Sequence, residues 1–314
     1  MIGPWCKFCL AIIWISALGY ASPVLAQNCN PSIAFASDTQ APLWIEKIIR
    51  KTNHNEKATE LIFKDIVERH PASLFILGDV VSLGCEDSKW KRMDVYLQRC
   101  RQNDIPVYAA LGNHELMLNA SKGAGKFQIR FPLHKPTGYV EVIDSVAIVL
   151  LNSNFGKMNG PDIVKQDAWY ARTIHKLDSD AAIKMIVVGC HHSPYTNSKV
   201  VKPSVLVQQK FVPAFIQSAK CVLFLSGHSH NFEQFNMQGK SFFVIGGGGG
   251  PHQPLYTNKE ITHDVAAGYK PMFHYLELTR CRDSLKVVSR QLKANFSGFI
   301  DGSTFFIRAK LQNH

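Results

Sequence analysis

Polar side chains that can bind metal ions follow five short apolar segments of this sequence. In chain order they are Asp38, Asp79, Asn113, His192 and the pair His228 and His230. In open α/β sheets, ligands bind outside the carboxyl ends of the strands. Carboxylate, amide and imidazole groups brought together there form a metal site rich in oxygen and nitrogen donors. The sequence therefore predicts a metal site at one sheet edge.

Each of these residues also has a simpler explanation when it is taken alone. An aspartate after a strand is commonly a helix N-cap, and a single histidine is commonly a hydrogen-bonded structural residue. The metal site is favoured because the same arrangement recurs at five strand ends.

The elements that must position these residues alternate along the chain. Apolar runs predict strands at 33–38, 73–77, 106–111, 184–189 and 222–225, and helical periodicity marks 43–50, 58–69, 87–102, 167–177 and 205–219. Residues 139–152 predict a hairpin that turns at Asp144-Ser145, and Pro213 is expected to kink or split its helix. Further β runs follow at 231–245, 274–278 and 285–292. This alternation favours an α/β fold with a second sheet or a mixed edge.

The motifs at the strand ends carry a family resemblance. In chain order they read Asp38-x-Gln40, Gly78-Asp79, Gly112-Asn113-His114-Glu115, His192-Ser193-Pro194 and Gly227-His228-Ser229-His230. Together they resemble the calcineurin-like metallophosphoesterase superfamily over roughly residues 33–250. The stretch from His192 to Ser198 is most similar to the purple acid phosphatase branch. The resemblance implies a four-layer αββα sandwich of two mixed sheets flanked by helices.

The resemblance also implies a site for two divalent metal ions. Asp79 would bridge the ions, Asp38, Gln40 and His230 would complete the first, and Asn113, His192 and His228 would complete the second. His191 is the neighbouring imidazole, but the His-x-Pro spacing selects His192 as the ligand. We expect His191 to have a structural or supporting role.

Two positions depart from the family pattern. Gln40 stands where the first motif commonly has histidine, and a neutral oxygen donor favours Mn²⁺, Mg²⁺ or iron over Zn²⁺. Ser82 stands where purple enzymes carry the tyrosine that binds ferric iron, so no purple absorption band is expected. The metal pair remains open among Mn, Fe, Zn and Mg.

The implied reaction is hydrolysis of a phosphate ester by a hydroxide that bridges the two ions. His114 is the best candidate for a catalytic group, because an imidazole titrates near neutral pH and can donate a proton to the leaving oxygen. Glu115 is expected to orient its neighbours. No G-x-S-x-G nucleophile motif occurs in the sequence.

Five consecutive glycines at 246–250 follow an apolar run. They permit close approach of backbone to the metals or to phosphate, or else form a flexible connection. Tyr195, Asn197 and His252 are further candidates for lining a substrate pocket.

The first 26 residues have the pattern of a cleaved signal peptide. Lys7 precedes an apolar run at 8–18, and Ala26 ends a small-residue cleavage site before Gln27. We therefore expect export to the periplasm or medium, with no membrane anchor after cleavage and with 27–314 as a single catalytic domain. Six cysteines would remain, and Cys85 and Cys100 are candidates for a local disulfide.

The composition, 46% hydrophobic and 19% charged in 314 residues, excludes disordered and fibrous classes. The net charge of +11 suits anionic partners, but no Lys/Arg run exceeds two residues, so we do not expect nucleic acid as a partner. We expect an exported phosphomonoesterase acting on a phosphorylated small molecule or a nucleotide. A phosphodiesterase or nucleotidase with the same site, a nuclease and a non-catalytic binding scaffold remain alternatives.

Overall fold

The computed structural model describes Met1 and residues 30–50, 52–256 and 262–308, and within them the strands form two six-stranded sheets. Apart from Met1, the predicted signal peptide lies outside this part of the chain, and so does Cys29. The first sheet has the order β12 (Phe299–Arg308), β11 (Ser284–Leu292), β10 (His274–Cys281), β1 (Ile33–Ala36), β2 (Ser73–Ile76), β3 (Val107–Ala109). The second has the order β4 (Tyr139–Ile143), β5 (Val146–Leu150), β6 (Met185–Cys190), β7 (Cys221–Ser226), β9 (Lys240–Ile245), β8 (Phe232–Met237).

The central strands are parallel, and they are almost entirely apolar because both of their faces are buried. Side chains alternate between the two faces of a strand. In β1, Ile33 and Phe35 enter the apolar cluster between the sheets, whereas Ala34 and Ala36 enter the cluster under the helices. A third cluster lies on the outer face of the second sheet.

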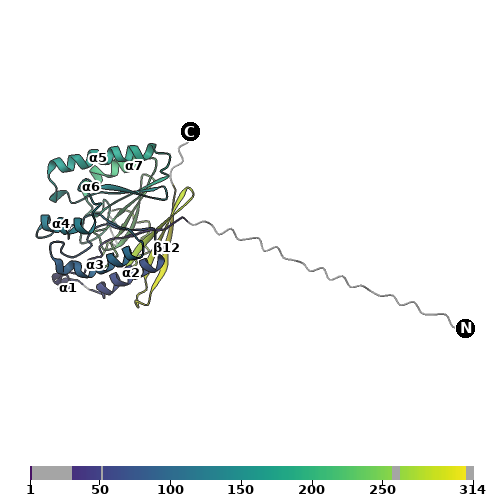
Figure 1. Cartoon of the computed structure of the whole chain (residues 1–314), viewed down its shortest axis with the longest axis horizontal. Helices are drawn as coiled ribbons and strands as arrows, with labels where there is room; N and C mark the ends of the chain where they lie inside the picture. The colour runs from purple at the N-terminus through teal and green to yellow at the C-terminus, as the bar shows by residue number, and fades with distance from the viewer. Residues whose placement is uncertain (2–29, 51, 257–261, 309–314) are drawn as a thin grey trace.

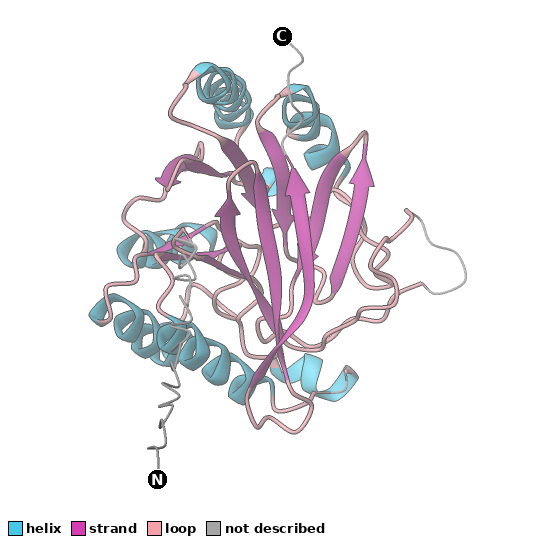
Figure 2. Ribbon diagram, turned by 90° about the vertical axis from the view of Figure 1, so that its right-hand side faces the viewer, coloured by secondary structure: helices cyan, strands magenta, loops and turns pink. Residues whose placement is uncertain are grey.

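Helices cover the outer faces of both sheets. The helices are α1 (Trp44–Ile49), α2 (Asn55–Arg69), α3 (Asp87–Gln102), α4 (Ala120–Arg130), α5 (Gly160–Ser179), α6 (Val205–Lys210) and α7 (Val212–Gln217). Figure 1 shows α1, α2 and α3 on one side of the sheets and α5, α6 and α7 on the other. Figure 2 shows the long strands between these helix layers. The expected αββα sandwich of two mixed sheets is confirmed.

Several local predictions can be compared with the structure. The helix expected at 205–219 is split into α6 and α7, with Pro213 in the first turn of α7. The hairpin turning at Asp144-Ser145 is present as β4 and β5. No described helix is both long and apolar enough to cross a bilayer.

The suggested disulfide between Cys85 and Cys100 is wrong, because both cysteines are free and buried. Cys85 precedes α3 and Cys100 lies in its last turn. A helix rises about 1.5 Å per residue, so the two Cα atoms are separated by far more than the roughly 4.4–6.8 Å that a disulfide permits.

Candidate metal centre

The strand ends of both sheets bring the predicted ligands to one place. Asp38 follows β1, Asp79 follows β2, and His228 and His230 follow β7. Donor atoms of Asp38, Asp79 and His191 lie within 4.8 Å of one another. All seven predicted ligands belong to this connected group, which is mostly buried.

Three of these residues have strained backbones. Asp38, Asp79 and His228 are in the left-handed region, with φ of 57°, 50° and 65°. Such conformations cost non-glycine residues roughly 1–3 kcal/mol and persist where the surroundings hold them. Here the constraints are hydrogen bonds: the His228 N–H donates to the Asp38 carboxylate, and the His114 N–H donates to Asp79 Oδ1 at 2.8 Å.

Glycine is needed beside Asp79. A Cβ on Gly112 would lie 2.2 Å from both the backbone nitrogen and Oδ1 of Asp79, so any side chain there would displace the carboxylate. This contact explains the glycine of the Gly112-Asn113 motif in physical terms.

His191 occupies the centre of the group. Its Nδ1 lies 2.9 Å from the Leu77 carbonyl oxygen, which can only accept, so Nδ1 carries a proton and donates it. Its Nε2 faces Asn113 Oδ1 at 3.0 Å and Asp79 Oδ2 at 3.2 Å. Without a metal ion the ring is protonated, and its Nε2–H donates to these oxygens. In the neutral ring, three lone-pair atoms would converge, an arrangement that fits a bound cation.

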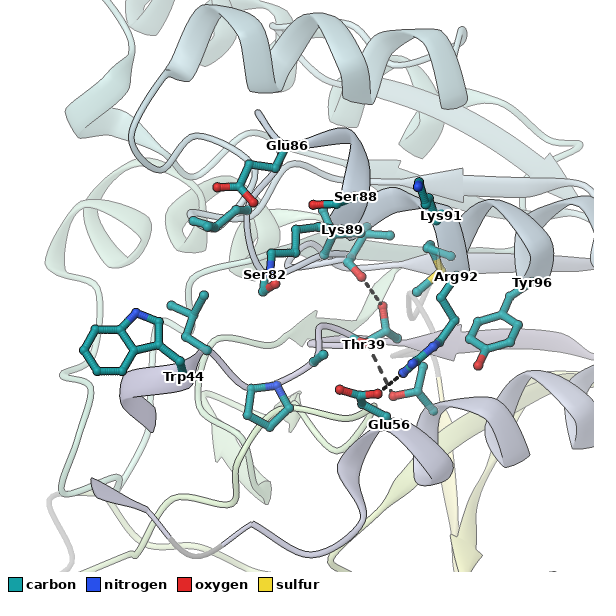
Figure 3. Close-up of a pocket in the computed structure, with 18 of the residues that line it drawn as sticks. Thr39, Trp44, Glu56, Ser82, Glu86, Ser88, Lys89, Lys91, Arg92 and Tyr96 are labelled. Atoms are coloured by element: carbon teal, nitrogen blue, oxygen red, sulfur yellow. Dashed lines mark hydrogen bonds and ion pairs between the residues drawn. The ribbon is translucent and has the colours of Figure 1, made fainter. Parts of the chain in front are cut away.

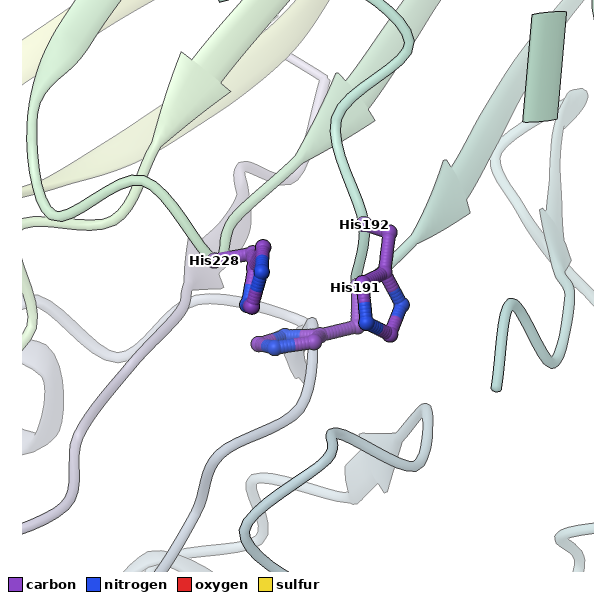
Figure 4. Close-up of side chains that lie close together, drawn as sticks. All are labelled: His191, His192 and His228. Atoms are coloured by element: carbon purple, nitrogen blue, oxygen red, sulfur yellow. The ribbon is translucent and has the colours of Figure 1, made fainter. Parts of the chain in front are cut away.

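His191, His192 and His228 form a cluster of three imidazoles, drawn in Figure 4. Their donor atoms lie within 4.8 Å of one another. The rings of His192 and His228 have centroids 4.5 Å apart. His192 Nδ1 lies 2.9 Å from Ser153 Oγ, and its Nε2 has no hydrogen-bond partner among the described residues.

Gln40 and His230 form the other end of the group. The Gln40 side-chain amide pairs donors with acceptors in the orientation in which its nitrogen donates to the backbone oxygens of Asp79 (2.8 Å) and Asp38 (3.1 Å). Gln40 Oε1 then lies 3.3 Å from His230 Nε2, which is also 3.4 Å from Asp38 Oδ1. His230 Nδ1 donates to the Pro251 carbonyl oxygen at 2.8 Å, which fixes the tautomer that offers Nε2 to a metal.

The site residues shift one another's pKa values. Burial acts to raise the pKa of Asp79, but the imidazoles of His191 and His114 outweigh it and hold that pKa well below its ordinary value. Burial acts to lower the pKa of His191, but Asp79 outweighs it and raises that pKa to about 9. Burial and then the neighbouring His191 lower the pKa of His192 to about 3. His191 is therefore the imidazole most strongly coupled to the carboxylates.

His114 is buried beside the donor group. Its Nδ1 lies 2.8 Å from the Ser82 carbonyl oxygen, to which it donates, and its Nε2 lies 3.8 Å from Asp79 Oδ2. The ring thus presents Nε2 toward the centre.

Glu115 holds the loops that carry Asp79 and Asn113. Its Oε2 accepts from the backbone N–H groups of Asp79 and Gly112, both at 2.9 Å, and Oε1 accepts from Val81 at 3.1 Å. Burial, together with the Asp79 carboxylate, raises the pKa of Glu115 to about 7. Its expected orienting role matches these contacts.

The glycine tract packs tightly against the ligands. A Cβ on Gly246 would lie 2.2 Å from the Ser229 carbonyl oxygen, and one on Gly250 would lie 2.5 Å from His230 Cε1. The Gly250 N–H donates to the Asp38 carbonyl oxygen at 2.8 Å. The tract is therefore a close-packed wall behind Asp38 and His230, which favours close backbone approach over the alternative of a flexible connection.

The remaining pocket candidates are placed differently. The Tyr195 ring packs against Phe235 and Phe242 in the apolar cluster under α6 and α7. Asn197 and His252 line a separate cavity of about 300 Å³.

The sequence interpretation gave His191 no place among the ligands, and the structure brings it into contact with two of them. The cause is which face of the sheet each residue of β6 occupies. Val187 of β6 faces the space between the sheets, whereas Ile186, Val188 and Cys190 face the outer cluster, so alternation directs His191 toward Asp79. Which face each residue occupies cannot be read from 185–188, which is apolar throughout. The assignment of His192 by its His-x-Pro spacing stays a prediction.

Comparisons with known proteins agree with this geometry. A model of the calcineurin-like phosphoesterase family matches residues 31–232. No curated protein matches the chain significantly in sequence.

Among solved structures, a purple acid phosphatase from yellow lupin has a TM-score of 0.62 at 14% identity, over 87% of this chain and 53% of that one. GAP50 of Plasmodium, described as an anchor in the inner membrane complex, has a TM-score of 0.64 at 13% identity, over 91% of this chain and 90% of that one. A dimetal phosphatase from Danio rerio has a TM-score of 0.55 at 12% identity, over 90% of this chain and 100% of that one. The chain thus spans about half the length of the lupin protein, and these likenesses show the fold alone.

Proposed function

Since the chain belongs to the calcineurin-like phosphoesterase family, a group of phosphoric ester hydrolases, we propose that it hydrolyses phosphate monoesters at a site for two divalent metal ions. The observation that carries the proposal is the convergence of buried and half-buried oxygen and nitrogen donors from five strand ends of two sheets. A fold that only needed stability would have little reason to bury two carboxylates beside four imidazoles.

The proposed ligands divide between the two ions. Asp79 would bridge them, and Asp38, Gln40 and His230 would complete the first. Asn113, His192 and His228 border the second, and we add His191 because its Nε2 faces both Asp79 and Asn113. The oxygen donor of Gln40 favours Mn²⁺, Mg²⁺ or iron at the first ion. Ser82 provides no phenolate, so the protein should lack a purple absorption band.

The charges suit an anionic substrate. Two divalent ions bring +4, and Asp38 and Asp79 together supply −2, so the loaded site remains electropositive. When bound, such ions lower the pKa of water toward about 7 and stabilise the charge that develops on a transferring phosphoryl group.

The chain's own residues position and protonate the substrate. His114 Nε2 faces the metal centre and is placed to donate a proton to the leaving oxygen. The leaving group then departs as a neutral alcohol rather than as an alkoxide. Its Nδ1 bond to Ser82 fixes the orientation of the ring, and Glu115 holds the Asp79 loop in place.

The monoester preference rests on the stretch from His192 to Ser198, which is similar to the purple acid phosphatase branch. A phosphodiesterase or nucleotidase would use the same ligands. A non-catalytic scaffold is the alternative from another class, and the likeness in fold to an anchor protein gives a reason to test it. We also propose export, on the signal-like pattern of residues 1–26.

The test is turnover of p-nitrophenyl phosphate and bis(p-nitrophenyl) phosphate by the purified protein with added Mn²⁺, with Asp79→Asn as the inactive control. Monoester turnover that is lost in Asp79→Asn supports the proposal. Preference for the diester would assign a phosphodiesterase, and activity on neither ester by folded, metal-loaded protein would favour the scaffold. Nucleic-acid binding that weakens steeply with salt would favour the nuclease.

A further inference from the structure

The loops that carry the proposed ligands are held by different groups in the two sheets. Thr39 Oγ1 donates to the Val80 carbonyl oxygen at 3.1 Å, which joins the loops after β1 and β2 beside a cavity of about 770 Å³, as Figure 3 shows. The Glu115 carboxylate then ties the loop after β2 to the loop after β3. The loops after β6 and β7 belong to the other sheet and carry three imidazoles of the donor group, so they need a support of their own.

The loop after β7 places both of its ligand histidines at the centre of a tight turn. The Ser229 N–H donates to the Gly227 carbonyl oxygen at 2.7 Å, and the Asn231 N–H donates to the Ser229 carbonyl oxygen at 2.7 Å. His228 and His230 are therefore the central residues of two consecutive three-residue turns, and His228 has a positive φ of 65°. A three-residue turn with positive φ is rare and strained, and it persists only where its surroundings hold it.

The buried carboxylate of Glu233 joins this turn to the loop after β6. Glu233 lies at the start of β8 and has no solvent exposure. Its Oε1 accepts from Thr196 Oγ1 at 2.6 Å and lies 3.3 Å from Ser229 Oγ, and its Oε2 accepts from the Asn197 N–H at 2.6 Å. Thr196 Oγ1 also lies 3.1 Å from Ser229 Oγ. One carboxylate thus contacts Ser229, which separates the two histidines of the turn, and the loop that carries His192.

The contacts of this carboxylate are all directed at the two loops. Burying a carboxylate is unfavourable unless hydrogen bonds replace the lost water. Burial raises the pKa of Glu233, and the hydrogen bonds from Thr196 and from the Asn197 N–H act against that rise. Within the described part of the chain, Glu233 makes no hydrogen bond or ion pair with the side chain of a proposed ligand. Its place in the second sheet therefore corresponds to that of Glu115 in the first.

We propose that Glu233 is a positioning residue for the metal centre: it holds the loops after β6 and β7 in the arrangement that lets His192, His228 and His230 bind the ions. The identity of these ligands rests on the proposed two-metal phosphoesterase function. Glu233 acts through Ser229 and the Asn197 N–H and not by contact with an ion. Because it orders both loops before metal arrives, metal binding does not have to order them.

The experiment measures Mn²⁺ binding to the folded, chelator-treated protein by calorimetric titration. Glu233→Ala should weaken binding roughly 10–100-fold, the range typical of groups that support metal ligands. Glu233→Gln should weaken it less than about tenfold, because its amide oxygen can still accept from the Asn197 N–H while the Thr196 hydroxyl turns to Ser229. An effect of the lost negative charge alone would instead be equal in the two variants.

Glu277→Ala is the matched control for a merely structural effect. Glu277 is also a buried glutamate, but it lies on β10 and its carboxylate pairs with Arg69 at 2.6 Å. This variant should lower the free energy of unfolding and leave the Mn²⁺ affinity of the folded protein unchanged. Thr196→Val serves if Glu233→Ala does not fold. It removes one hydroxyl of the same network and should weaken Mn²⁺ binding roughly two- to tenfold.

An unchanged Mn²⁺ affinity in Glu233→Ala and Thr196→Val, an equal loss in Glu277→Ala, or an equal loss in Glu233→Gln and Glu233→Ala would overturn the proposal. Turnover of p-nitrophenyl phosphate by the same samples separates these results from failure of the proposed function. If the unaltered protein binds Mn²⁺ but hydrolyses no ester, the phosphoesterase function fails, while the affinities still decide the role of Glu233. An unaltered protein that binds no Mn²⁺ would overturn both.

Discussion

His191 Nε2 lies 3.2 Å from Asp79 Oδ2 in the interior of the protein, where the His191 side chain has no solvent exposure. The two groups come from different sheets, His191 after β6 and Asp79 after β2. This pair therefore joins the two halves of the sandwich at the donor group. Its separation matches that of two ligands sharing one ion, and the first prediction follows from it.

His191→Ala should weaken Mn²⁺ binding roughly 100-fold or more, because it removes a donor that faces both Asp79 and Asn113; even changes to groups behind the ligands typically cost 10–100-fold. His192→Ala is the matched comparison and should weaken Mn²⁺ binding about tenfold, because His192 lies beside the imidazoles of His191 and His228 and makes no hydrogen bond or ion pair with Asp38 or Asp79. Metal content after dialysis and calorimetric titration measure both. The opposite order, with His192→Ala the more damaging, would restore the assignment made from the His-x-Pro spacing.

His114→Ala should lower kcat by about 10²–10⁴-fold and leave metal content unchanged, because the side chain donates a proton and holds no ion. The backbone N–H that donates to Asp79 Oδ1 is kept in this variant. Turnover of p-nitrophenyl phosphate and metal analysis of the same sample test it. A loss of metal in parallel with activity would contradict the role given to His114.

Glu115→Gln should reduce the free energy of unfolding by about 1–3 kcal/mol, because the amide nitrogen cannot accept from the backbone N–H groups that Glu115 now satisfies. Urea unfolding at pH 8, above the Glu115 pKa of about 7, is the measurement. Glu68→Gln on exposed α2 is the control, and an equal effect in both variants would rule out the special role of Glu115.

Stability should fall in mild acid through His134, which is away from the metal centre. Burial against Phe127 and Tyr139 lowers the pKa of His134 from 6.5 to about 4. Below pH 6.5, His134 is protonated in the unfolded chain, but in the folded chain it stays neutral down to about pH 4. The unfolded state therefore binds more protons in this window, and the free energy of unfolding falls as the pH falls through it. From pH 7.5 to pH 5 the loss attributable to His134 is about 2 kcal/mol.

His134→Phe should remove that part of the pH dependence, as measured by urea unfolding at both pH values. His175→Asn, at an exposed position of α5, should leave it intact. An unchanged pH dependence in His134→Phe would show that His134 does not protonate in this window on unfolding.

The sequence predicts the central sheet regions and the ligand types well, because buried parallel strands leave unmistakable apolar runs. Three features escape it for identifiable reasons. Helix α4 is not predicted, because Gly123 and Gly125 lower its helix propensity. Gly123 is nevertheless required by the packing, since a Cβ there would lie 1.8 Å from the Glu115 carbonyl oxygen. Strand β12 contains Asp301-Gly302-Ser303, which has the composition of a turn, and is held by pairing with β11. The choice between His191 and His192 depends on strand phase, which a run buried on both faces does not reveal.

We propose that a site for two metal ions drives phosphoester hydrolysis in this protein. The most direct test of this proposal is titration of chelator-treated protein with Mn²⁺ while bound metal and p-nitrophenyl phosphate turnover are followed together. We predict about two ions per chain, with turnover appearing as they bind, and neither full loading nor turnover in Asp79→Asn. Folded protein that binds no stoichiometric metal, or that binds two ions without hydrolysing any phosphoester, would contradict a two-metal phosphoesterase.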